Sequence, residues 1–298
     1  MRIAVIDIGG TFIKYGVFEN GEITGVGEVP TNAAAGAPAI LETVCGLIRA
    51  MGKVDRIGID TAGEVDTATN TVRSADNIPG YNGLCVQQFI ESRLHIPCAI
   101  ENDVNAQALG EMHYGAALGE KDFLMVSYGT GVGGAIVLNG QVFRGSQNSA
   151  AEFGGIVTHP EALAGNGNHV PGTYESYAAT TALVRSVQKE YPSLCNGRDI
   201  FREMHTPRVK ALVDSWIDEV SYGLITLIQI FNPRLIVLGG GILREKYITD
   251  RLASLMTDRT RPSFHGFRLV PAALGNKAGL YGAAVVAQSI AADAKFYG

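Results

Sequence analysis

Two segments of the chain share one pattern, in which an apolar run that predicts a strand leads through a glycine-containing turn into a second such run. The first turn is Gly9-Gly10-Thr11, after the apolar residues 3–6, and the second is residues 129–134, after residues 123–126. Glycine lets the backbone approach a ligand closely, and consecutive N–H groups in such a turn suit phosphate oxygens. The pattern predicts two phosphate-binding turns that serve one nucleotide.

The second turn also spells G-x-G-x-x-G, which is typical of dinucleotide-binding domains only when a helix follows the glycines. Here residues 135–143 follow, and they predict two short strands around an Asn139-Gly140 turn. A dehydrogenase is therefore disfavoured. For either turn taken alone, an ordinary hairpin turn remains an alternative.

The composition is that of a globular protein with a sizeable core. Of 298 residues, 46% are hydrophobic and 18% are charged, which suits two domains or one large one. A net charge of −5 without a long basic run disfavours nucleic-acid binding. The four cysteines are scattered, so we expect reduced thiols in a cytoplasmic protein, without a disulfide framework. No apolar stretch reaches the length of a membrane span.

Predicted strands and helices alternate along the chain, which favours an α/β protein with a mostly parallel sheet. The second half repeats the order of the first, so the halves are interpreted as diverged copies with a boundary near residues 105–120. The elements expected in the second half include an irregular stretch at 154–172, helices at 173–190 and 207–231, a strand at 235–238 and a final helix at 280–292.

Several motifs together resemble those of the ROK family (repressors, open reading frames, kinases), a bacterial branch of the actin/hexokinase/Hsp70 superfamily. They are residues 7–11, 77–81, 101–106 and 129–134. The resemblance implies an α/β, two-lobed, ribonuclease H-like (actin-like ATPase) fold with a cleft between the lobes. It also implies a cytoplasmic kinase that uses ATP and Mg²⁺ to phosphorylate a sugar, usually at its 6-hydroxyl, and that forms a homodimer.

The resemblance suggests how the chain divides. We expect an N-terminal lobe of residues 1–115, rejoined by a C-terminal helix over 279–298, with the sugar-side residues and the first phosphate turn. We expect a C-terminal lobe of residues 116–278 with the second phosphate turn, the adenosine site and the dimer surface.

Asp103 is the candidate general base, because it lies where a predicted strand ends and a predicted helix begins. An N-cap is the alternative for this residue. The resemblance implies that Asn77, Asn102, Glu152 and Glu175 bind the sugar with it, although Asn102 could instead stabilise the turn. The residues expected to contact the nucleotide or its metal are Asp7 (Mg²⁺, through water), Gly9, Gly10, Thr11, Lys14, Gly129, Thr130, Gly131, Gly133, Gly240 and Gly241.

The chain departs from the family at the zinc motif. Many members bind a structural zinc through a His and three cysteines, but Gly155 stands in place of that His and residues 165–175 contain no cysteine. His159 and His169 cannot supply four ligands, so no zinc is predicted. Gly155 also removes a side chain that contacts the sugar in the family. An N-acylhexosamine or a β-glucoside therefore becomes a candidate substrate beside a free hexose.

Two other functions stay open from the residues. A sugar-sensing protein of the same fold would bind sugar without turnover, and the presence of Asp103 argues against it. An actin-like ATPase would need the phosphate turns but not the sugar-binding set.

Overall fold

The computed structural model describes residues 1–75, 78–165 and 170–290. The chain divides into two compact units. Unit 1 comprises residues 1–119, 144–150 and 276–298, and unit 2 comprises residues 120–143 and 151–275. The assignment of separate functions to an N-terminal and a C-terminal lobe stays a prediction.

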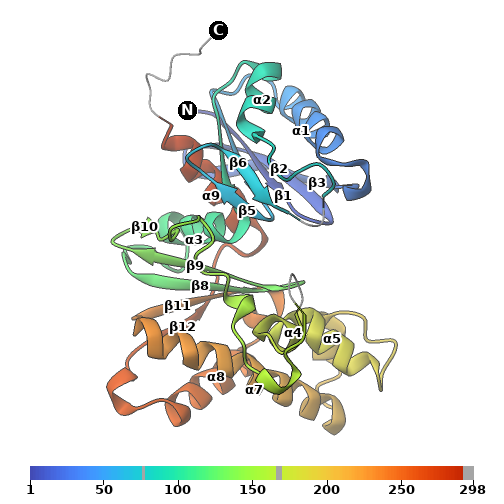
Figure 1. Cartoon of the computed structure of the whole chain (residues 1–298), viewed down its shortest axis with the longest axis vertical. Helices are drawn as coiled ribbons and strands as arrows, with labels where there is room; N and C mark the ends of the chain where they lie inside the picture. The colour runs from blue at the N-terminus through green and yellow to red at the C-terminus, as the bar shows by residue number, and fades with distance from the viewer. Residues whose placement is uncertain (76–77, 166–169, 291–298) are drawn as a thin grey trace. The chain divides into compact units, whose positions relative to one another are not determined.

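Unit 1 is built on a five-stranded sheet with the order β3-β2-β1-β4-β7 (Figure 1). β2 is antiparallel to both its neighbours, whereas β1, β4 and β7 run parallel. Its elements are β1 (Ile3–Ile8), β2 (Phe12–Glu19), β3 (Glu22–Pro30), η1 (Ala33–Ala35), α1 (Ala37–Ala50), β4 (Arg56–Thr61), β5 (Glu64–Asp66), β6 (Thr71–Ser74), α2 (Val86–Leu94), β7 (Cys98–Asn102), α3 (Asp103–Tyr114), η6 (Gly275–Lys277, which begins at the unit boundary) and α9 (Ala278–Gln288).

The two faces of the unit 1 sheet bury different residues of the same strands, because side chains alternate along a strand. Ile6 and Ile8 of β1 pack in the core that α1 and α2 cover. Ile3 and Val5 face the other way and pack against Leu280 of α9. β1 is thus buried on both sides, which is why its residues 3–6 form a continuous apolar run.

Helix α9 approaches its neighbours so closely that side chains are excluded at three glycines. A Cβ atom on Gly58 of β4 would lie 2.0 Å from the carbonyl oxygen of Ala283. A Cβ on Gly282 would lie 1.8 Å from the carbonyl oxygen of Ala106 in α3. A Cβ on Gly110 of α3 would lie 2.3 Å from the carbonyl oxygen of Ala278. Backbone contact therefore fixes α9 between α3 and the sheet.

Unit 2 repeats this plan with the strand order β10-β9-β8-β11-β12, antiparallel on one side of β8 and parallel on the other. The internal repeat expected from the sequence is thereby confirmed in the topology. Its elements are β8 (Phe123–Tyr128), β9 (Val132–Leu138), β10 (Gln141–Val142), η2 (Phe153–Gly155), η3 (Pro160–Ala162), α4 (Tyr174–Ala178), α5 (Thr180–Gln188), α6 (Gly197–Arg202), α7 (Pro207–Phe231), β11 (Leu235–Gly239), η4 (Gly241–Arg244), α8 (Lys246–Arg259), η5 (Pro262–Phe264) and β12 (Arg268–Pro271).

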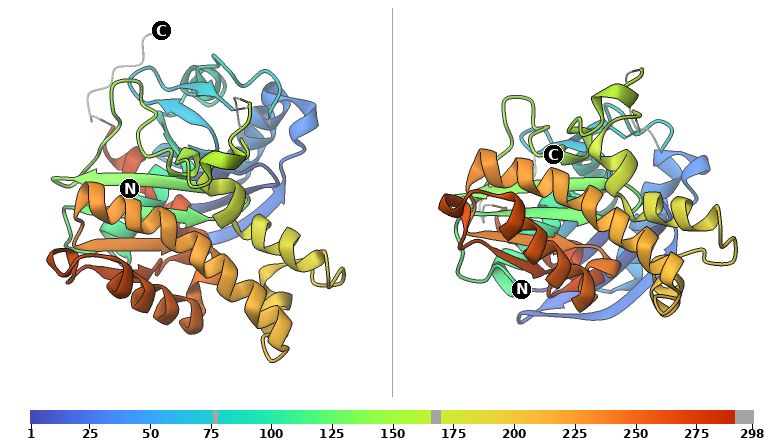
Figure 2. Two further views of the ribbon diagram at one scale, coloured as in Figure 1. Left: turned by 60° about the horizontal axis from the view of Figure 1, so that its bottom comes forward. Right: turned by 90° about the horizontal axis from the view of Figure 1, so that it is seen from below.

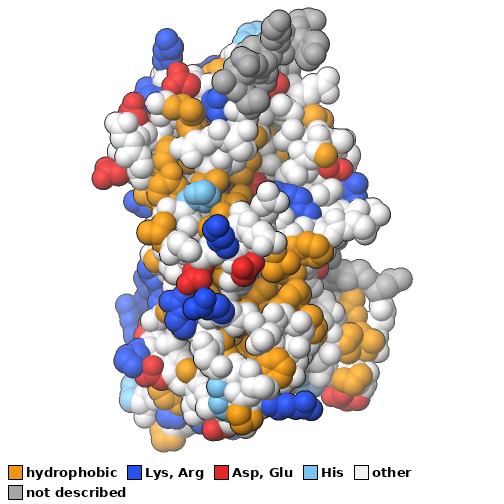
Figure 3. All heavy atoms as spheres, turned by 90° about the vertical axis from the view of Figure 1, so that its left-hand side faces the viewer, with side chains coloured by type: hydrophobic (Ala, Val, Ile, Leu, Met, Phe, Trp, Pro, Cys, Tyr) orange, Lys and Arg blue, Asp and Glu red, His pale blue; other side chains and the backbone are white. Residues whose placement is uncertain are grey.

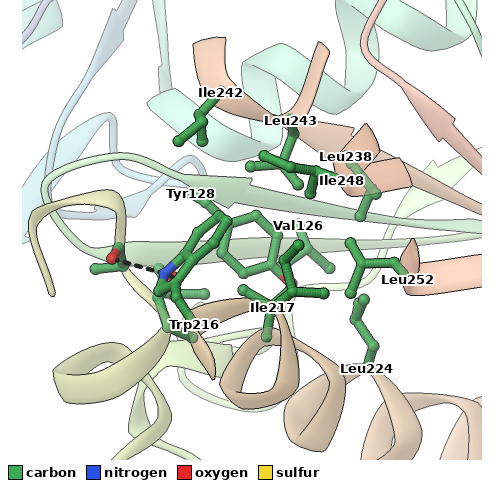
Figure 4. Close-up of a cluster of buried hydrophobic side chains, with 14 of the residues drawn as sticks. Val126, Tyr128, Trp216, Ile217, Leu224, Leu238, Ile242, Leu243, Ile248 and Leu252 are labelled. Atoms are coloured by element: carbon green, nitrogen blue, oxygen red, sulfur yellow. Dashed lines mark hydrogen bonds between the residues drawn. The ribbon is translucent and has the colours of Figure 1, made fainter. Parts of the chain in front are cut away.

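Helices α7 and α8 lie against one face of the unit 2 sheet (Figure 2). Figure 4 shows Val126 and Leu238 of the sheet facing Ile217 and Leu252 of these helices. The indole of Trp216 is buried there, and its N–H donates to the carbonyl oxygen of Ala178 at 3.0 Å. The hydrophobic contacts and this bond together attach α7 to the sheet and to the end of α4.

The sequence-based expectations for unit 2 were wrong at three places, one of which is the short helix α6, which was not expected. The helix expected over 173–190 is broken at Ala179, which is extended and whose carbonyl oxygen also receives the Trp216 N–H at 3.2 Å. Helix α8 was not expected, although Ile248, Leu252, Leu255 and Met256 are buried at helical spacing. Charged residues between them lowered the apparent apolar content of that segment.

The surface drawn in Figure 3 carries charges of both signs, as the modest net charge of the chain suggests. On the face drawn in Figure 3, basic and acidic side chains are interspersed among apolar ones. Within residues 1–75, 78–165 and 170–290, no helix combines the length and the apolar content needed to cross a bilayer.

The close approach of α9 predicts the effect of adding one methyl group. Gly282→Ala should destabilise the protein by about 1–3 kcal/mol, because the new Cβ overlaps the Ala106 carbonyl. Gly46→Ala is the matched control: Gly46 is exposed in α1 and a Cβ there meets no atom within 4 Å, so a gain of about 0.5–1 kcal/mol is expected. Urea unfolding of both variants measures the difference, and equal stability of the two would contradict this account of the packing.

Candidate functional site

The parallel strands β1, β4 and β7 of unit 1 all end at one edge of the sheet. β1 ends at Ile8, β4 at Thr61 and β7 at Asn102, and these three residues are direct neighbours across the sheet. The carboxyl edge of parallel strands is where α/β proteins place ligands. The turn Gly9-Gly10-Thr11 follows β1 at this edge, and Asp103 follows β7.

Asp103 is the first residue of α3, and Asn102 is the N-cap of that helix. The Asn102 side-chain oxygen accepts the N–H groups of Val104 at 2.9 Å and Asn105 at 3.0 Å. Its amide nitrogen donates to Asp103 Oδ1 at 2.9 Å and to the Gly63 carbonyl oxygen at 2.9 Å. The N-cap role considered for Asp103 therefore belongs to Asn102, which also orients the carboxylate of Asp103.

A row of charged side chains crosses the same sheet one residue before this edge. Lys14, Asp7, Asp60 and Glu101 are successive partners on β2, β1, β4 and β7, so they share a face. Lys14 Nζ bonds Asp7 Oδ2 at 2.9 Å. Partial burial acts to lower the pKa of Lys14, but the negative charge of Asp7 and this hydrogen bond outweigh burial and raise it. Lys14 is thus a cation that neutralises Asp7.

At the other end of the row, Glu101 is 1% exposed and pairs with Arg144 through two bonds, 2.9 Å and 2.6 Å long. Glu101 Oε1 also accepts the N–H of Asn102 at 2.9 Å and an amide proton of Asn105 at 3.3 Å. A bidentate guanidinium together with these donors satisfies a buried carboxylate. Both outer acids of the row therefore have a cation of their own.

Asp60 lies between these two acids in the row and forms no ion pair with a cation among the described residues. It is 1% exposed, and no donor among the described residues reaches either of its oxygens. Burial first, then the negative charges of Asp7 and Asp103, raise the pKa of Asp60 well above that of an ordinary carboxyl. Its neighbour Asp7 is another carboxyl, so a hydrogen bond between the two requires a shared proton.

The first glycine turn is fixed at one end and open at the other. The Gly9 N–H donates to the Phe12 carbonyl at 3.1 Å, and the Gly9 carbonyl accepts the hydroxyl of Thr31 at 2.7 Å. A Cβ on Gly10 would meet no atom within 4 Å, and Gly10 and Thr11 are exposed. The turn can therefore receive an oxyanion beside Gly10 without rearrangement of its anchor.

The second glycine turn, in unit 2, is held by Glu175. Glu175 Oε2 accepts the N–H of Val132 at 3.0 Å, and a Cβ on Gly131 would lie 2.1 Å from that oxygen. The hydroxyl of Thr181 bonds the Thr130 carbonyl at 2.6 Å. A Cβ on Gly129 would meet no atom within 4 Å. Position 131 requires glycine for space, and position 129 leaves the turn open.

The remaining predicted residues of unit 2 lie in two further turns. Glu152 is exposed and follows Ala151, whose φ of 70° is unusual for a residue with a Cβ. Gly240 has a φ of 109°, and a Cβ on it would lie 2.3 Å from the carbonyl oxygen of Tyr128. Gly241 begins η4, and a Cβ there would meet no atom within 4 Å.

Two expectations concern residues 76–77 and 166–169, which lie outside the described residues: the sugar-binding role of Asn77 and the loop position of His169. His159 is described, and its ring stacks on Tyr177 at 3.8 Å and lies 3.5 Å from Glu219 Oε2. Within the described ranges, no group of three or more His, Cys, Asp or Glu side chains could hold a metal ion.

This chemistry fits Mg²⁺ better than zinc. Mg²⁺ is held by one or two carboxylates together with water and substrate phosphate oxygens, so it does not require a cluster of three protein ligands. Asp7 and Asp60 supply two neighbouring carboxyl groups beside the open glycine turn, and the oxygens of Asp60 have no donor among the described residues. Asp7 is the member of the pair that is partly exposed.

Three residues of this arrangement were missed in the sequence. Asp60 stands in a predicted buried strand, and an acid at such a position is itself a signal. Glu101 lies in the motif at residues 101–106, but the sequence indicated no role for it. Arg144 gave no signal, because its partner Glu101 is 43 residues away in the chain.

Comparisons with known proteins identify the family of the chain. The ROK family profile matches residues 3–290. The glucokinase of Streptomyces coelicolor is 31% identical over 317 residues, covering 95% of this chain and 96% of that protein. The beta-glucoside kinase of Listeria innocua is 31% identical over 294 residues, covering 95% and 96%. A ROK family glucokinase from Streptomyces griseus, solved in complex with glucose and AMPPNP, superimposes with a TM-score of 0.83 at 30% identity, covering 97% and 99%.

The two like sheets and these likenesses define an α/β protein of the ribonuclease H-like, actin-like ATPase fold. The chain belongs to the ROK family. The expected fold class is confirmed. The roles given to individual site residues stay predictions.

The buried carboxyl of Asp60 predicts an unusual dependence of stability on pH. Because its folded pKa is raised, the folded protein keeps a proton that the unfolded chain loses, and stability falls as the pH rises from the ordinary carboxyl range toward the folded pKa. Asp60→Asn cannot titrate, so in EDTA it should be more stable than the wild type at neutral pH, and its stability should vary less with pH across this range. Urea unfolding across a pH series measures this.

Asp66→Asn is the control, because the pKa of Asp66 is shifted in the opposite direction and the expected change in stability is therefore opposite as well. Burial acts to raise the pKa of Asp66, but bonds from the Ala68 N–H and Arg73 outweigh it and lower the pKa. Its stabilisation is present above the ordinary carboxyl range and lost in acid, so Asp66→Asn should destabilise at neutral pH. An Asp60→Asn protein less stable than the wild type at neutral pH would mean that Asp60 is ionised and compensated.

Proposed function

We propose that the protein is an ATP-dependent carbohydrate kinase, which transfers the γ-phosphate of Mg-ATP to a sugar hydroxyl. The observation that carries the proposal is the position of Asp103. Its carboxylate is fixed by Asn102 and by the Val104 N–H, at the sheet edge that also carries the open turn at Gly10. The named activities of the two curated relatives, and the glucose and AMPPNP bound to the S. griseus protein, support the same reaction.

In the proposed reaction the sugar oxygen attacks the γ-phosphorus, the bond to the β-phosphate oxygen breaks, and ADP leaves. Asp103 accepts the hydroxyl proton as the new O–P bond forms. Asn102 keeps the carboxylate in one orientation throughout, because its own amide and carbonyl groups are fixed by α3 and Gly63. Positioning of this kind supplies much of the rate in phosphoryl transfer.

The glycine turns hold the nucleotide in this proposal. Backbone N–H groups at Gly9, Gly10 and Thr11 bind phosphate oxygens, and residues 129–133 bind others. Gly240 and Gly241 leave room for the adenosine. Asp7, which has Asp60 as its neighbour on β4, would hold Mg²⁺ directly or through water, and the ion would neutralise phosphate charge there. Lys14 is paired with Asp7, so it would meet the phosphate together with that carboxylate rather than alone.

The sugar-binding set of the proposal comprises Asn77, Asn102, Asp103, Glu152 and Glu175. Glu175 also braces the second glycine turn through Val132, so it joins sugar binding to phosphate binding. The 6-hydroxyl as acceptor, the homodimer and the cytoplasmic location belong to the proposal as well. Sugar-independent ATP hydrolysis would favour an actin-like ATPase, and sugar binding without ADP release would favour a sensor.

Asp103→Asn should lower kcat by about 10²–10⁴-fold while the fold is retained, because the amide cannot take the proton. Coupled measurement of sugar-dependent ADP release tests this. Asp199→Asn is the matched control, since Asp199 lies in the first turn of α6 and bonds its N-cap Asn196 in the same way. Near-normal turnover of Asp103→Asn would refute the assignment of the base.

The space at Gly155 predicts the choice of sugar. Gly155 is exposed and a Cβ there would meet no atom within 4 Å, so a substituted sugar is not obstructed at this point. N-acylhexosamines or β-glucosides should show higher kcat/KM than glucose in an ATP-coupled panel. Gly155→His should reduce that preference, whereas Val157→His, which adds the same ring two residues away, should not. Strict preference for free glucose would contradict the idea of an open pocket.

A further inference from the structure

A short segment of unit 1 interrupts the sequence of unit 2. Residues 144–150 belong to unit 1, although unit 2 comprises the residues immediately before and after them. We call this segment the strap. The Ala150 N–H donates to the Arg144 carbonyl at 3.1 Å, which closes the strap into a loop.

Three polar contacts join the strap to the rest of unit 1. Arg73 donates to the Gln147 carbonyl at 2.9 Å, and the hydroxyl of Ser149 donates to Glu64 Oε2 at 2.8 Å. Arg144 makes the third contact, with Glu101. The first two involve exposed or half-buried groups at the β5–β6 hairpin, whereas Glu101 is 1% exposed.

Glu101 connects the strap to the start of α3. Its Oε1 accepts from Arg144, from the Asn102 N–H and from the Asn105 side chain. Asn102 in turn caps α3 and donates to Asp103. A chain of direct bonds thus runs from Arg144 through Glu101 and Asn102 to the carboxylate of Asp103.

We propose that Arg144 is a positioning residue for the reaction: through Glu101 it fixes the first turn of α3 and hence the orientation of Asp103. The inference rests on the proposed role of Asp103 as the base. Two bonds of guanidinium to carboxylate fix direction as well as charge, which a lysine could not do. Without Arg144, Glu101 becomes a buried and incompletely compensated anion next to the helix start.

The strap also gives this contact a second consequence. Glu152 follows the strap after Ala151, so the chain that carries this proposed sugar ligand is anchored on Glu101 as well. Arg144 therefore positions the proposed base through Glu101 and the backbone that leads to Glu152 through the chain. Loss of Arg144 should affect kcat and the KM for sugar more than the KM for ATP.

The first arm of the test does not depend on catalysis. Hydrogen exchange of the peptide spanning residues 101–110 should be about tenfold faster in Arg144→Gln than in the wild type. Arg208→Gln is the matched control, because Arg208 makes the same kind of forked contact with Glu190 on an exposed surface of unit 2, from Nε to Oε2 at 2.9 Å and from Nη2 to Oε1 at 2.5 Å. Unchanged exchange in Arg144→Gln would overturn the proposal, even if the wild type phosphorylated no sugar and the proposed function had failed.

The second arm separates positioning from stability. Arg144→Gln should lower kcat by about 10²-fold, with the KM for ATP within about threefold of the wild type. Arg144→Lys keeps the charge but loses the fork, so it should keep the thermal stability and still lose kcat. The double variant Glu101→Gln/Arg144→Gln should regain stability without regaining kcat. Recovery of kcat in the double variant, or normal kcat in Arg144→Lys, would mean that the Arg144–Glu101 pair only stabilises the fold. If Arg144→Gln does not fold, these two variants alone test whether Arg144 positions Asp103.

Discussion

The site of unit 1 depends on three acids in one cross-strand row, of which Asp60 and Glu101 are buried and Asp7 is partly exposed. Asp7, Asp60 and Glu101 are neighbours on β1, β4 and β7, and the register of these parallel strands places all three side chains on the same face of the sheet. Lys14 compensates the first and Arg144 the last. The middle acid, whose oxygens have no donor among the described residues, is left to a proton or to a cation bound beside it. A sheet that served only stability would place apolar side chains there, so the row is best understood as preparation for a charged ligand.

The sequence was sufficient for the features that depend on local chemistry. Apolar runs bounded by glycine predicted the strands on both sides of each phosphate turn, because that pattern reflects backbone requirements within a few residues. Asp103 at a strand end was also placed correctly along the chain, at the start of α3. The fold class followed from several such motifs in order, and the two sheets of identical strand order agree with it.

What could not be predicted depends on contacts between residues far apart in sequence. Asn102, not Asp103, became the N-cap because both of its side-chain groups find partners, one of them at Gly63 in another turn. Glu175 reaches the turn at Val132, 43 residues earlier, and nothing near either residue indicates it. The break at Ala179 likewise involves the indole of Trp216, whose helix was predicted at 207–231 but whose contact with Ala179 nothing in the local sequence indicates.

The position of α9 has a consequence for the order in which the protein is made. One face of the unit 1 sheet, including Ile3 and Val5, is covered by a helix that the ribosome adds only after all of unit 2. Gly279 of that helix also lies against the carboxyl of Asp60, where a Cβ would come within 3.0 Å of both oxygens. The nascent N-terminal unit must therefore wait, with an apolar face and an acidic edge uncovered, while all of unit 2 is translated. Unit 1, which contains β1, can be completed only after unit 2 has been synthesised.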